Sequence, residues 1–332
     1  MVLTQGRAAA ASTGSGRYRT AGRRRVQIYL PIADLPVNIF LVLGMGLAVG
    51  FISGMFGIGG GFLMTPLLIF IGISPAVAVA SVSSHIAASS FTGAITYWRR
   101  RALDLALALM LLSAGIVGTA TGVWLFTLLR ALDQLDLMIG LSYVTLLTVV
   151  GVLMIYESVQ AELRTRKGMP ATLRRPGSHT WLHGLPFKLR FKRSKIYVSA
   201  IPVLAIGYII GFVGAIMGIG GGFLLVPMLI YFLRVPTATV IGTSMVLTLV
   251  TMASATVMHA ATNHLVDAVL ALILMVGGVI GAHFGARTGQ RMRGERLRLL
   301  LGLLVFAVGL RFAYELVVRP DDLFSLRQVR GE

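Results

Sequence analysis

The sequence predicts an all-α, polytopic integral membrane protein made of two homologous repeats, each with four membrane spans and one short half-helix bounded by glycines. Three observations lead to this prediction. Of the 332 residues, 56% are hydrophobic and only 13% are charged, proportions far from those of soluble proteins. Apolar stretches long enough to cross about 30 Å of hydrocarbon recur along the chain. A glycine-rich segment occurs twice, which indicates an internal duplication.

The elements can be assigned in chain order from apolar length. We expect spans at about residues 36–58, 76–98, 103–129 and 137–156, and again at about 196–218, 238–258, 266–288 and 297–318. Residues 61–73 and 222–233 are too short to span comfortably, and we interpret them as half-helices. The predicted organisation is a basic N-terminal tail (1–30), a first transmembrane repeat (31–156), a basic cytoplasmic loop (157–195), a second transmembrane repeat (196–318) and a C-terminal tail (319–332).

The duplication is clearest in GFISGMFGIGGGFLMTPLLIF at residues 50–70 and GFVGAIMGIGGGFLLVPMLIY at residues 211–231. A shift of 161 residues gives 13 identities in the 26 positions that begin at Gly50. Further along, a shift of 163 aligns Asp104 with Asp267 and three glycines of each half. Transporters are often built from such repeats, with the substrate site where the repeats meet.

The net charge of +18 lies mainly in segments outside the spans. Residues 1–26 hold six arginines and no acidic residue, and residues 157–195 hold ten Lys or Arg against two glutamates. This distribution is typical of cytoplasmic segments beside anionic lipid, so the expected partner is the bilayer and not nucleic acid. The oligomeric state stays open.

Loop charges leave the relative orientation of the repeats open. Residues 99–101 are all arginine, whereas the corresponding loop near Asn263 has no Lys or Arg. The loop after Arg130 is acidic, whereas its counterpart after Arg287 is basic. This exchange favours inverted repeats. However, inversion would put the arginine-rich tail outside, while four crossings per half would keep both basic segments inside.

The repeated GIGGG run holds a helix poorly, so it predicts a break inside the membrane followed by a new helix. Four unpaired N–H groups and the positive end of the helix dipole would then lie within the protein. Without side chains, glycines let an anion approach those groups closely. The predicted substrate-binding glycines are Gly57, Gly59, Gly60, Gly61, Gly218, Gly220, Gly221 and Gly222. The alternative is that these glycines only permit close helix crossings.

Other small and polar residues have predicted roles beside the breaks. Gly118, Gly122, Gly281 and Gly285 are spaced four apart within spans, which favours helix packing, and Pro66 and Pro227 would help to shape the new helices. The spans after the half-helices are rich in hydroxyls, from which we add Ser83, Ser84, His85, Thr243 and Ser244 to the candidate substrate site. Hydroxyls of this kind also bond back to their own helix, and a histidine can simply be satisfied by its neighbours.

Several function classes are excluded. The chain has no cysteine, and its histidines lack the spacing or the accompanying carboxylates of a metal site, so we expect neither a metal nor a cofactor. The sequence lacks a nucleophile elbow and a phosphate-binding loop, and the position that would complete a dinucleotide fingerprint is Phe62. We therefore expect no enzyme and no catalytic residues. Asp104 and Asp267 lie at helix starts, where capping is the expected role.

The doubled pattern from Gly50 to Pro66 and from Gly211 to Pro227 resembles the signature of the sulfite exporter TauE/SafE family of bacterial membrane permeases. The resemblance covers roughly residues 36–318. It implies a multi-pass protein of the bacterial cytoplasmic membrane that exports a small sulfur-containing anion such as sulfite or sulfoacetate. Two alternatives remain: a permease for another small carboxylate or a zwitterionic metabolite, and a membrane scaffold that transports nothing.

Overall fold

The structure, a computed structural model, describes residues 27–56, 58–99, 103–166, 186–191, 196–233, 237–288 and 294–317. The helices in these ranges are α1 (Ile39–Phe56), α2 (Gly61–Phe70), α3 (Pro75–Arg99), α4 (Leu105–Ala131), α5 (Leu135–Arg166), α6 (Ala200–Met217), α7 (Gly222–Tyr231), α8 (Thr237–Met258), α9 (Ala268–Thr288) and α10 (Gly294–Val317). A π-helical turn, η2 (His259–Asn263), continues α8.

The observed helices follow the predicted order, and each predicted span and half-helix corresponds to one of them. Six of the described helices are long and apolar enough to cross a membrane, namely α1, α4, α5, α6, α8 and α9. The hydroxyl-rich α3 is 25 residues long, and most of its side chains are buried. The two half-helices α2 and α7 have 10 residues each, about 15 Å at the rise of an α-helix, which is half of the hydrocarbon thickness.

The all-α prediction missed two short β-hairpins. Strands β1 (Gln27–Leu30) and β2 (Leu35–Asn38) pair immediately before α1, and β3 (Lys188–Phe191) and β4 (Ile196–Ser199) pair immediately before α6. Both are antiparallel, with Gln27 opposite Asn38 and Lys188 opposite Ser199. Each hairpin leads directly into a capped helix, because Asn38 Oδ1 accepts from Phe40 N at 2.9 Å and Ser199 Oγ accepts from Ile201 N at 3.3 Å.

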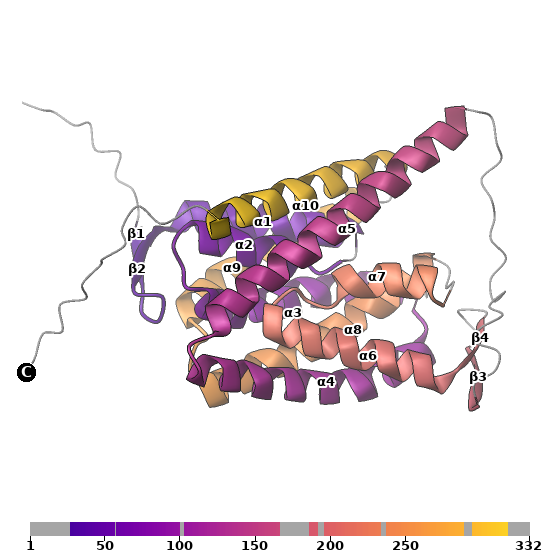
Figure 1. Cartoon of the computed structure of the whole chain (residues 1–332), viewed down its shortest axis with the longest axis horizontal. Helices are drawn as coiled ribbons and strands as arrows, with labels where there is room; N and C mark the ends of the chain where they lie inside the picture. Colours follow the sequence, from indigo (N-terminus) through magenta and orange to yellow (C-terminus); the bar gives the residue numbers. More distant parts are fainter. Residues whose placement is uncertain are drawn as a thin grey trace, which may run out of the picture.

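The two hairpins lie at opposite ends of the molecule. Figure 1 shows β1–β2 and the C-terminal end of α10 at the left, and β3–β4 and the C-terminal end of α5 at the right. The predicted tails and most of the basic loop, including residues 1–26, 167–185 and 319–332, lie outside the described residues. Residues 157–166 of that loop continue α5 as a helix beyond the predicted span.

The first helix of each half packs in parallel against a helix of the other half. Successive glycines of α1 face successive residues of α9: Gly46 faces Leu274, Gly50 faces Gly278, and Gly54 faces Ala282. A Cβ on Gly50 or Gly54 would overlap the backbone of α9. The helices can therefore approach as closely as small-residue motifs allow in membranes.

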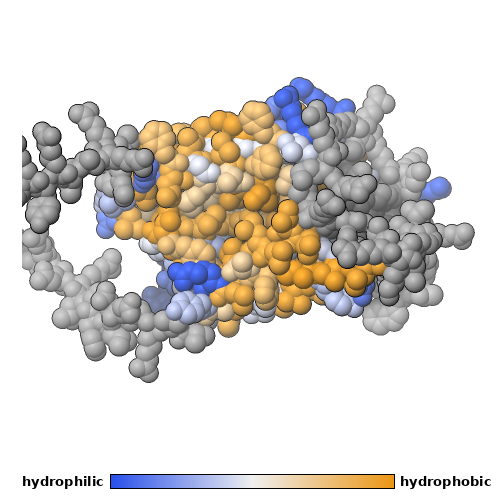
Figure 2. Space-filling view, turned by 90° about the horizontal axis from the view of Figure 1, so that it is seen from above, coloured by the Kyte–Doolittle hydropathy of each residue, from blue (hydrophilic) through white to orange (hydrophobic). Residues whose placement is uncertain are grey.

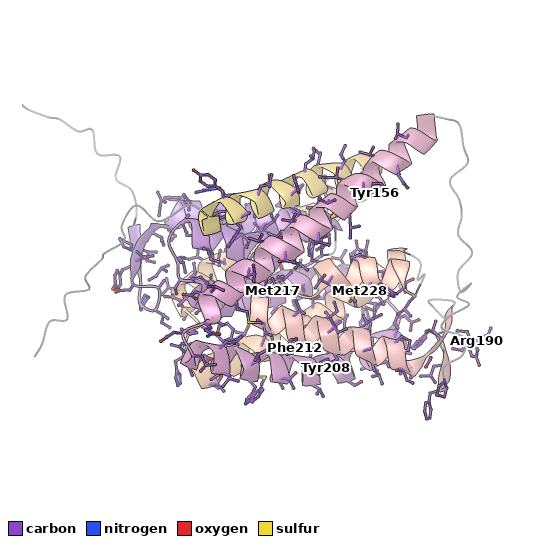
Figure 3. All side chains as sticks on the ribbon, viewed as in Figure 1. Tyr156, Arg190, Tyr208, Phe212, Met217 and Met228 are labelled. Carbon is purple, nitrogen blue, oxygen red and sulfur yellow. The ribbon has the colours of Figure 1, made fainter. Side chains whose placement is uncertain are left out.

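Helices α4 and α6 pack in the same way. A Cβ on Gly118 would overlap the carbonyl oxygen of Tyr208, and one on Gly122 would lie 2.6 Å from that of Phe212. In the α1–α9 pair, Gly281 faces the carbonyl of Leu47 and Gly285 that of Phe51, the residues 161 positions before Tyr208 and Phe212. Figure 3 labels Tyr208 and Phe212 on α6, beside α4.

Apolar side chains cover the middle of the face seen in Figure 2, and hydrophilic side chains lie toward its margins. Inside, α3 packs against α8 and α9, and Gly93 of α3 meets the side chain of Met245 of α8. At the periphery, α5 and α10 pack antiparallel, since Gly151 meets Phe306 and Gly309 meets Leu147. Residues 77–90 of α3 are thus surrounded mainly by protein, whereas Phe91, Ile95 and Trp98 nearer its end are exposed.

Both predicted aspartate caps are confirmed. Asp104 Oδ1 accepts from Leu107 N at 3.3 Å at the start of α4. Asp267 Oδ1 accepts from Val269 N at 3.1 Å and from Leu270 N at 3.0 Å at the start of α9. Each cap satisfies amides that the first helical turn leaves without a partner.

Asp267 also holds the first hairpin. Its second oxygen, Oδ2, accepts from Ile32 N at 2.9 Å and Ala33 N at 3.4 Å, in the turn between β1 and β2. Its own amide donates to Ser81 Oγ of α3 at 3.0 Å. The carboxylate is 0% exposed, and one buried aspartate thereby joins the hairpin, α3 and α9.

We predict that Gly281→Leu destabilises the protein and Gly44→Leu does not. A side chain at Gly281 would collide with the carbonyl of Leu47. Helices α1 and α9 would have to move apart to relieve this collision. At Gly44, on α1, nothing lies within 4 Å of the added Cβ. Overpacking should cost Gly281→Leu about 3 kcal/mol. Thermal unfolding in detergent would measure this, and equal melting temperatures for the two variants would contradict the packing assignment.

We predict that Asp267→Ala lowers the free energy of unfolding by about 3 kcal/mol, because the cap of α9 and the bonds to the hairpin turn are lost together. Asp136→Ala is the control, since Asp136 is exposed at the start of α5. Hydrogen exchange should show faster exchange at Ile32 and Ala33 in the Asp267 variant alone. Unchanged protection of those two amides would show that the carboxylate does not hold the turn.

Candidate substrate site at the two glycine-rich helix breaks

Each glycine run reverses the direction of the chain inside the protein. Helix α1 ends at Phe56 and α2 begins at Gly61, and Gly59 between them has a φ of +74°. The corresponding Gly220, between α6 and α7, has a φ of +72°. Glycine adopts this conformation without the steric cost that a side chain would bring. Gly57, the first glycine of the predicted site, lies outside the described residues.

The short helices fold back along the helices that precede them. A Cβ on Gly60 would lie 2.5 Å from Cγ1 of Val49 and 3.2 Å from Cβ of Ser53, both on α1. Gly221 meets Ile210 of α6, the residue 161 positions after Val49. Each break is therefore the tip of a helical hairpin, α1–α2 or α6–α7.

The two tips meet each other. The Cβ position of Gly59 is 2.9 Å from the carbonyl oxygen of Gly220, and that of Gly220 is 3.1 Å from the carbonyl oxygen of Gly59. One residue into each short helix, the rings of Phe62 and Phe223 stack with centroids 4.4 Å apart and an interplanar angle of 12°. The N-termini of α2 and α7 thus converge on one point.

The glycines of the two runs also face each other's backbone. A Cβ on Gly61 would overlap the carbonyl oxygen of Gly218, and a Cβ on Gly222 would overlap that of Ile58. The close-crossing role considered for these glycines therefore matches their surroundings in this structure. It does not exclude a second role in binding, because the same lack of side chains exposes the amides.

The amides at the helix starts are only partly used. Gly61 N donates to Gly59 O at 2.5 Å, and Gly222 N donates to Gly220 O. Leu63 N donates to Gly60 O, and Leu224 N donates to Gly221 O, each at 3.2 Å. Among the described residues, the amides of Phe62 and Phe223 donate to no backbone carbonyl outside regular helical bonding. They are the helix-start amides left for a ligand.

The carbonyls at the end of α6 are bound by side chains from other helices. Tyr143 of α5 donates its hydroxyl to Met217 O at 2.6 Å, and Figure 3 labels Met217 at this end of α6. The other donors are His259 Nε2 to Ala215 O at 3.1 Å, Thr65 Oγ1 to Gly218 O at 3.3 Å and Thr248 Oγ1 to Gly220 O at 3.4 Å. No pattern in the sequence pointed to Tyr143 or Thr65 as neighbours of the break, whereas Thr248 lies on the hydroxyl-rich face that the sequence predicts beside it.

The predicted hydroxyls mainly bond to their own helices. Ser83 Oγ donates to Val79 O at 2.9 Å, Ser84 Oγ to Ser81 O at 2.6 Å and Ser244 Oγ to Ile241 O at 2.8 Å. Thr243 Oγ1 accepts from Asp104 N at 3.4 Å, at the start of α4. Two side chains contact both glycine runs: Ile86, whose methyl groups meet Gly61 and Gly220, and Thr248, which meets Gly59 and Gly221.

His85 lies next to Ile86 on α3, fully buried against α9. Its Nδ1 is 2.7 Å from Leu274 O, and its ring covers Gly278, where a Cβ would overlap Cε1 of the ring. Pro66 and Pro227 lie inside α2 and α7, at the sixth residue of each. Among the described residues, no group of three His, Cys, Asp or Glu side chains is placed to hold a metal ion.

The site has no charged side chain in the segments that build it. Residues 39–98 and 196–233 contain no Asp, Glu, Lys or Arg. The local field at the junction therefore comes from the backbone, with the positive ends of the α2 and α7 dipoles pointing at each other. Such an arrangement can attract an anion without a counter-ion side chain.

Comparison with known proteins shows which family of proteins this chain is similar to. The profile of the family "Sulfite exporter TauE/SafE" matches residues 42–312. A "Probable membrane transporter protein" of Xylella fastidiosa is 30% identical over 283 residues, which covers 82% of this chain and 94% of the relative. The "Probable membrane transporter protein YunE" of Bacillus subtilis is 22% identical over 287 residues, covering 84% of this chain and 98% of the relative.

A shorter similarity extends to a plant protein. "Sulfite exporter TauE/SafE family protein 1" of Arabidopsis thaliana is 49% identical over 60 residues, 18% of this chain and 13% of the relative. No solved structure matches the chain significantly. The family profile spans both glycine-rich breaks, and the bacterial relatives are covered almost end to end. The chain therefore belongs to the sulfite exporter TauE/SafE family, whose members are membrane transporters and not enzymes.

Proposed function

We propose that the protein exports a small sulfur oxyanion, such as sulfite or sulfoacetate, across the bacterial cytoplasmic membrane, and that the anion binds where the two helix breaks meet. The observation that carries this proposal is the convergence of the α2 and α7 N-termini, with Phe62 stacked on Phe223. Each N-terminus contributes about half a positive charge and one amide that remains available. The family match supports the substrate class.

We further propose that the two halves are inverted repeats. Contacts in one half recur in the other with the partners exchanged: α1 packs on α9 as α6 packs on α4. The two hairpins have the same register, 161 positions apart, and lie at opposite ends of the molecule (Figure 1). Re-entrant α1–α2 and α6–α7 hairpins leave three full crossings per half, and an odd number is what inversion requires.

Transport requires the two tips to separate. The two tips are in backbone contact in this structure. An anion that binds between them must therefore push the tips apart, and the tips can close again when the anion leaves. The Tyr143 hydroxyl donates to Met217 O at the α6 end and also interacts with Thr65 of α2. Thr65 in turn donates to Gly218 O, so separation of the tips must break this set of bonds between α2, α5 and α6.

The substrate class is tested with purified protein in liposomes. We expect saturable flux of sulfite and sulfoacetate that exceeds the flux of acetate and of a zwitterionic amino acid by at least about tenfold, because two helix N-termini favour negative charge. Radiotracer efflux compares the solutes, with protein-free liposomes as the background. If the zwitterion crosses as fast as the anions, the site is not selective for anions. If no solute crosses faster than in protein-free liposomes, the protein is a scaffold and not a transporter.

The role of the backbone is tested by proline, which removes an N–H that no ordinary substitution can remove. We predict that Phe62→Pro weakens sulfite binding about tenfold or more relative to Phe62→Ala, because one hydrogen bond to a charged group is lost. Both variants lose the ring stack, so their difference isolates the amide. The first turn of a helix tolerates proline, and the preceding Gly61 has no side chain to clash.

The second break offers the same pair, Phe223→Pro and Phe223→Ala. Binding by isothermal calorimetry gives the affinity, and melting temperatures check that each pair is equally folded. If proline and alanine variants bind sulfite alike at both breaks, the amides are not ligands.

A further inference from the structure

The buried ring of His85 has one nitrogen without a partner. The side chain is 0% exposed. Its Nδ1 lies 2.7 Å from the carbonyl oxygen of Leu274, and a carbonyl only accepts, so Nδ1 carries the hydrogen. In the neutral ring, Nε2 is then a lone-pair acceptor, and it has no hydrogen-bond partner among the described residues. A buried polar atom in this state marks a place where something else binds.

The ring lies at the depth of the first break. It covers Gly278 of α9, and Gly278 in turn faces Gly50 of α1. The same turn of α1 carries Val49 and Ser53, which contact Gly60 on the other side. Ser53 Oγ is also buried and without a partner among the described residues. The α2 N-terminus, Ser53 and the His85 ring are therefore joined by a short chain of contacts through α1 and α9.

Few other titratable groups surround the ring. Helices α1, α2 and α8 have none in their sequences. On α9, His283 and Arg287 are exposed and lie two turns or more beyond Gly278. Asp267, seven residues before Leu274, is bound to backbone amides. The remaining described titratable side chains on helices that contact α3 are Tyr97 and Arg99 of α3 itself, Asp136, Tyr143 and Tyr156 of α5, and Tyr208 of α6.

The histidine is present in one half only. Leu247 of α8 meets Gly115 of α4 as His85 meets Gly278 of α9, so a leucine occupies the corresponding position. The other buried histidine, His259, uses both ring nitrogens: Nε2 bonds to Ala215 O at 3.1 Å, and Nδ1 lies 3.3 Å from Asn263 Nδ2. His259 thus has a bonding role at the α6 end, and the exposed His283 of α9 serves as the control for His85.

We propose that Nε2 of His85 takes up a proton together with the transported anion. This inference rests on the proposed function. A proton from water adds to the Nε2 lone pair, and the imidazolium then donates Nε2–H toward the anion at the first break. Neither charge is favourable alone in an apolar interior, whereas the pair is. One proton thus accompanies each anion, and the gradients decide the direction.

Calorimetry in two buffers of different ionisation enthalpy counts the protons taken up when sulfoacetate binds to the purified protein. Both acidic groups of sulfoacetate stay ionised above about pH 5.5, since carboxyl groups titrate near 4, so any uptake belongs to the protein. We expect about one proton per anion for the wild type and for His283→Gln, and about none for His85→Gln. Wild-type affinity should fall by up to about tenfold per unit of rising pH.

The glutamine amide can still donate to Leu274 O, which keeps that contact. His85→Asn is the second variant if His85→Gln does not fold, as judged by its melting temperature. Binding without proton uptake in the wild type, or uptake that persists in the His85 variants, overturns the proton site and leaves the anion site intact. No sulfoacetate or sulfite binding at any pH overturns the proposed function, and this inference with it.

Discussion

In a bilayer, a backbone carbonyl or amide without a partner costs several kcal/mol, and every helix that ends inside the membrane must meet this constraint. The protein contains two such interruptions, and they are satisfied in different ways. At the end of α6, Tyr143, His259, Thr65 and Thr248 supply hydrogen to four carbonyls. At the first tip, Val226 of α7 stands in place of Thr65, and Ile86 of α3 stands in place of Thr248. The halves share a backbone plan and differ in their chemistry.

The two tips therefore differ in how the polar groups around them are bonded. The α6–α7 tip is tied to α2, α5 and α8 through its carbonyls. Around the α1–α2 tip lie Ser53 and His85, each with a buried polar atom that has no partner among the described residues. Under the proposed function, a moving element must work against a part that stays in place, and this difference between the two tips would serve that need.

Much of this fold was accessible from the sequence. Apolar length located all the helices, and the 161-residue shift identified the two breaks before any coordinates were available. The hairpins were missed because each strand has only four residues, with little alternation of apolar and polar side chains. The two hairpins also differ in sequence, since Val37 and Val198 are the one identical pair when residues 27–38 are aligned with residues 188–199. Of the candidate site, the glycines are at the junction. Ser83 and Ser84 turn to their own helix, since a hydroxyl pattern does not reveal which carbonyl it will meet.

The parallel pairing of α1 with α9 has a consequence for biosynthesis. The contact between Gly50 and Gly278 joins residues about 230 positions apart, and a ribosome adding about 5–20 residues per second needs tens of seconds to make that interval. During this time α1 and α2 are inserted without the helix that covers their glycine face and without the opposing tip. Neither half is a complete folding unit, so we expect the newly made N-terminal half to depend on the insertion machinery until α9 emerges.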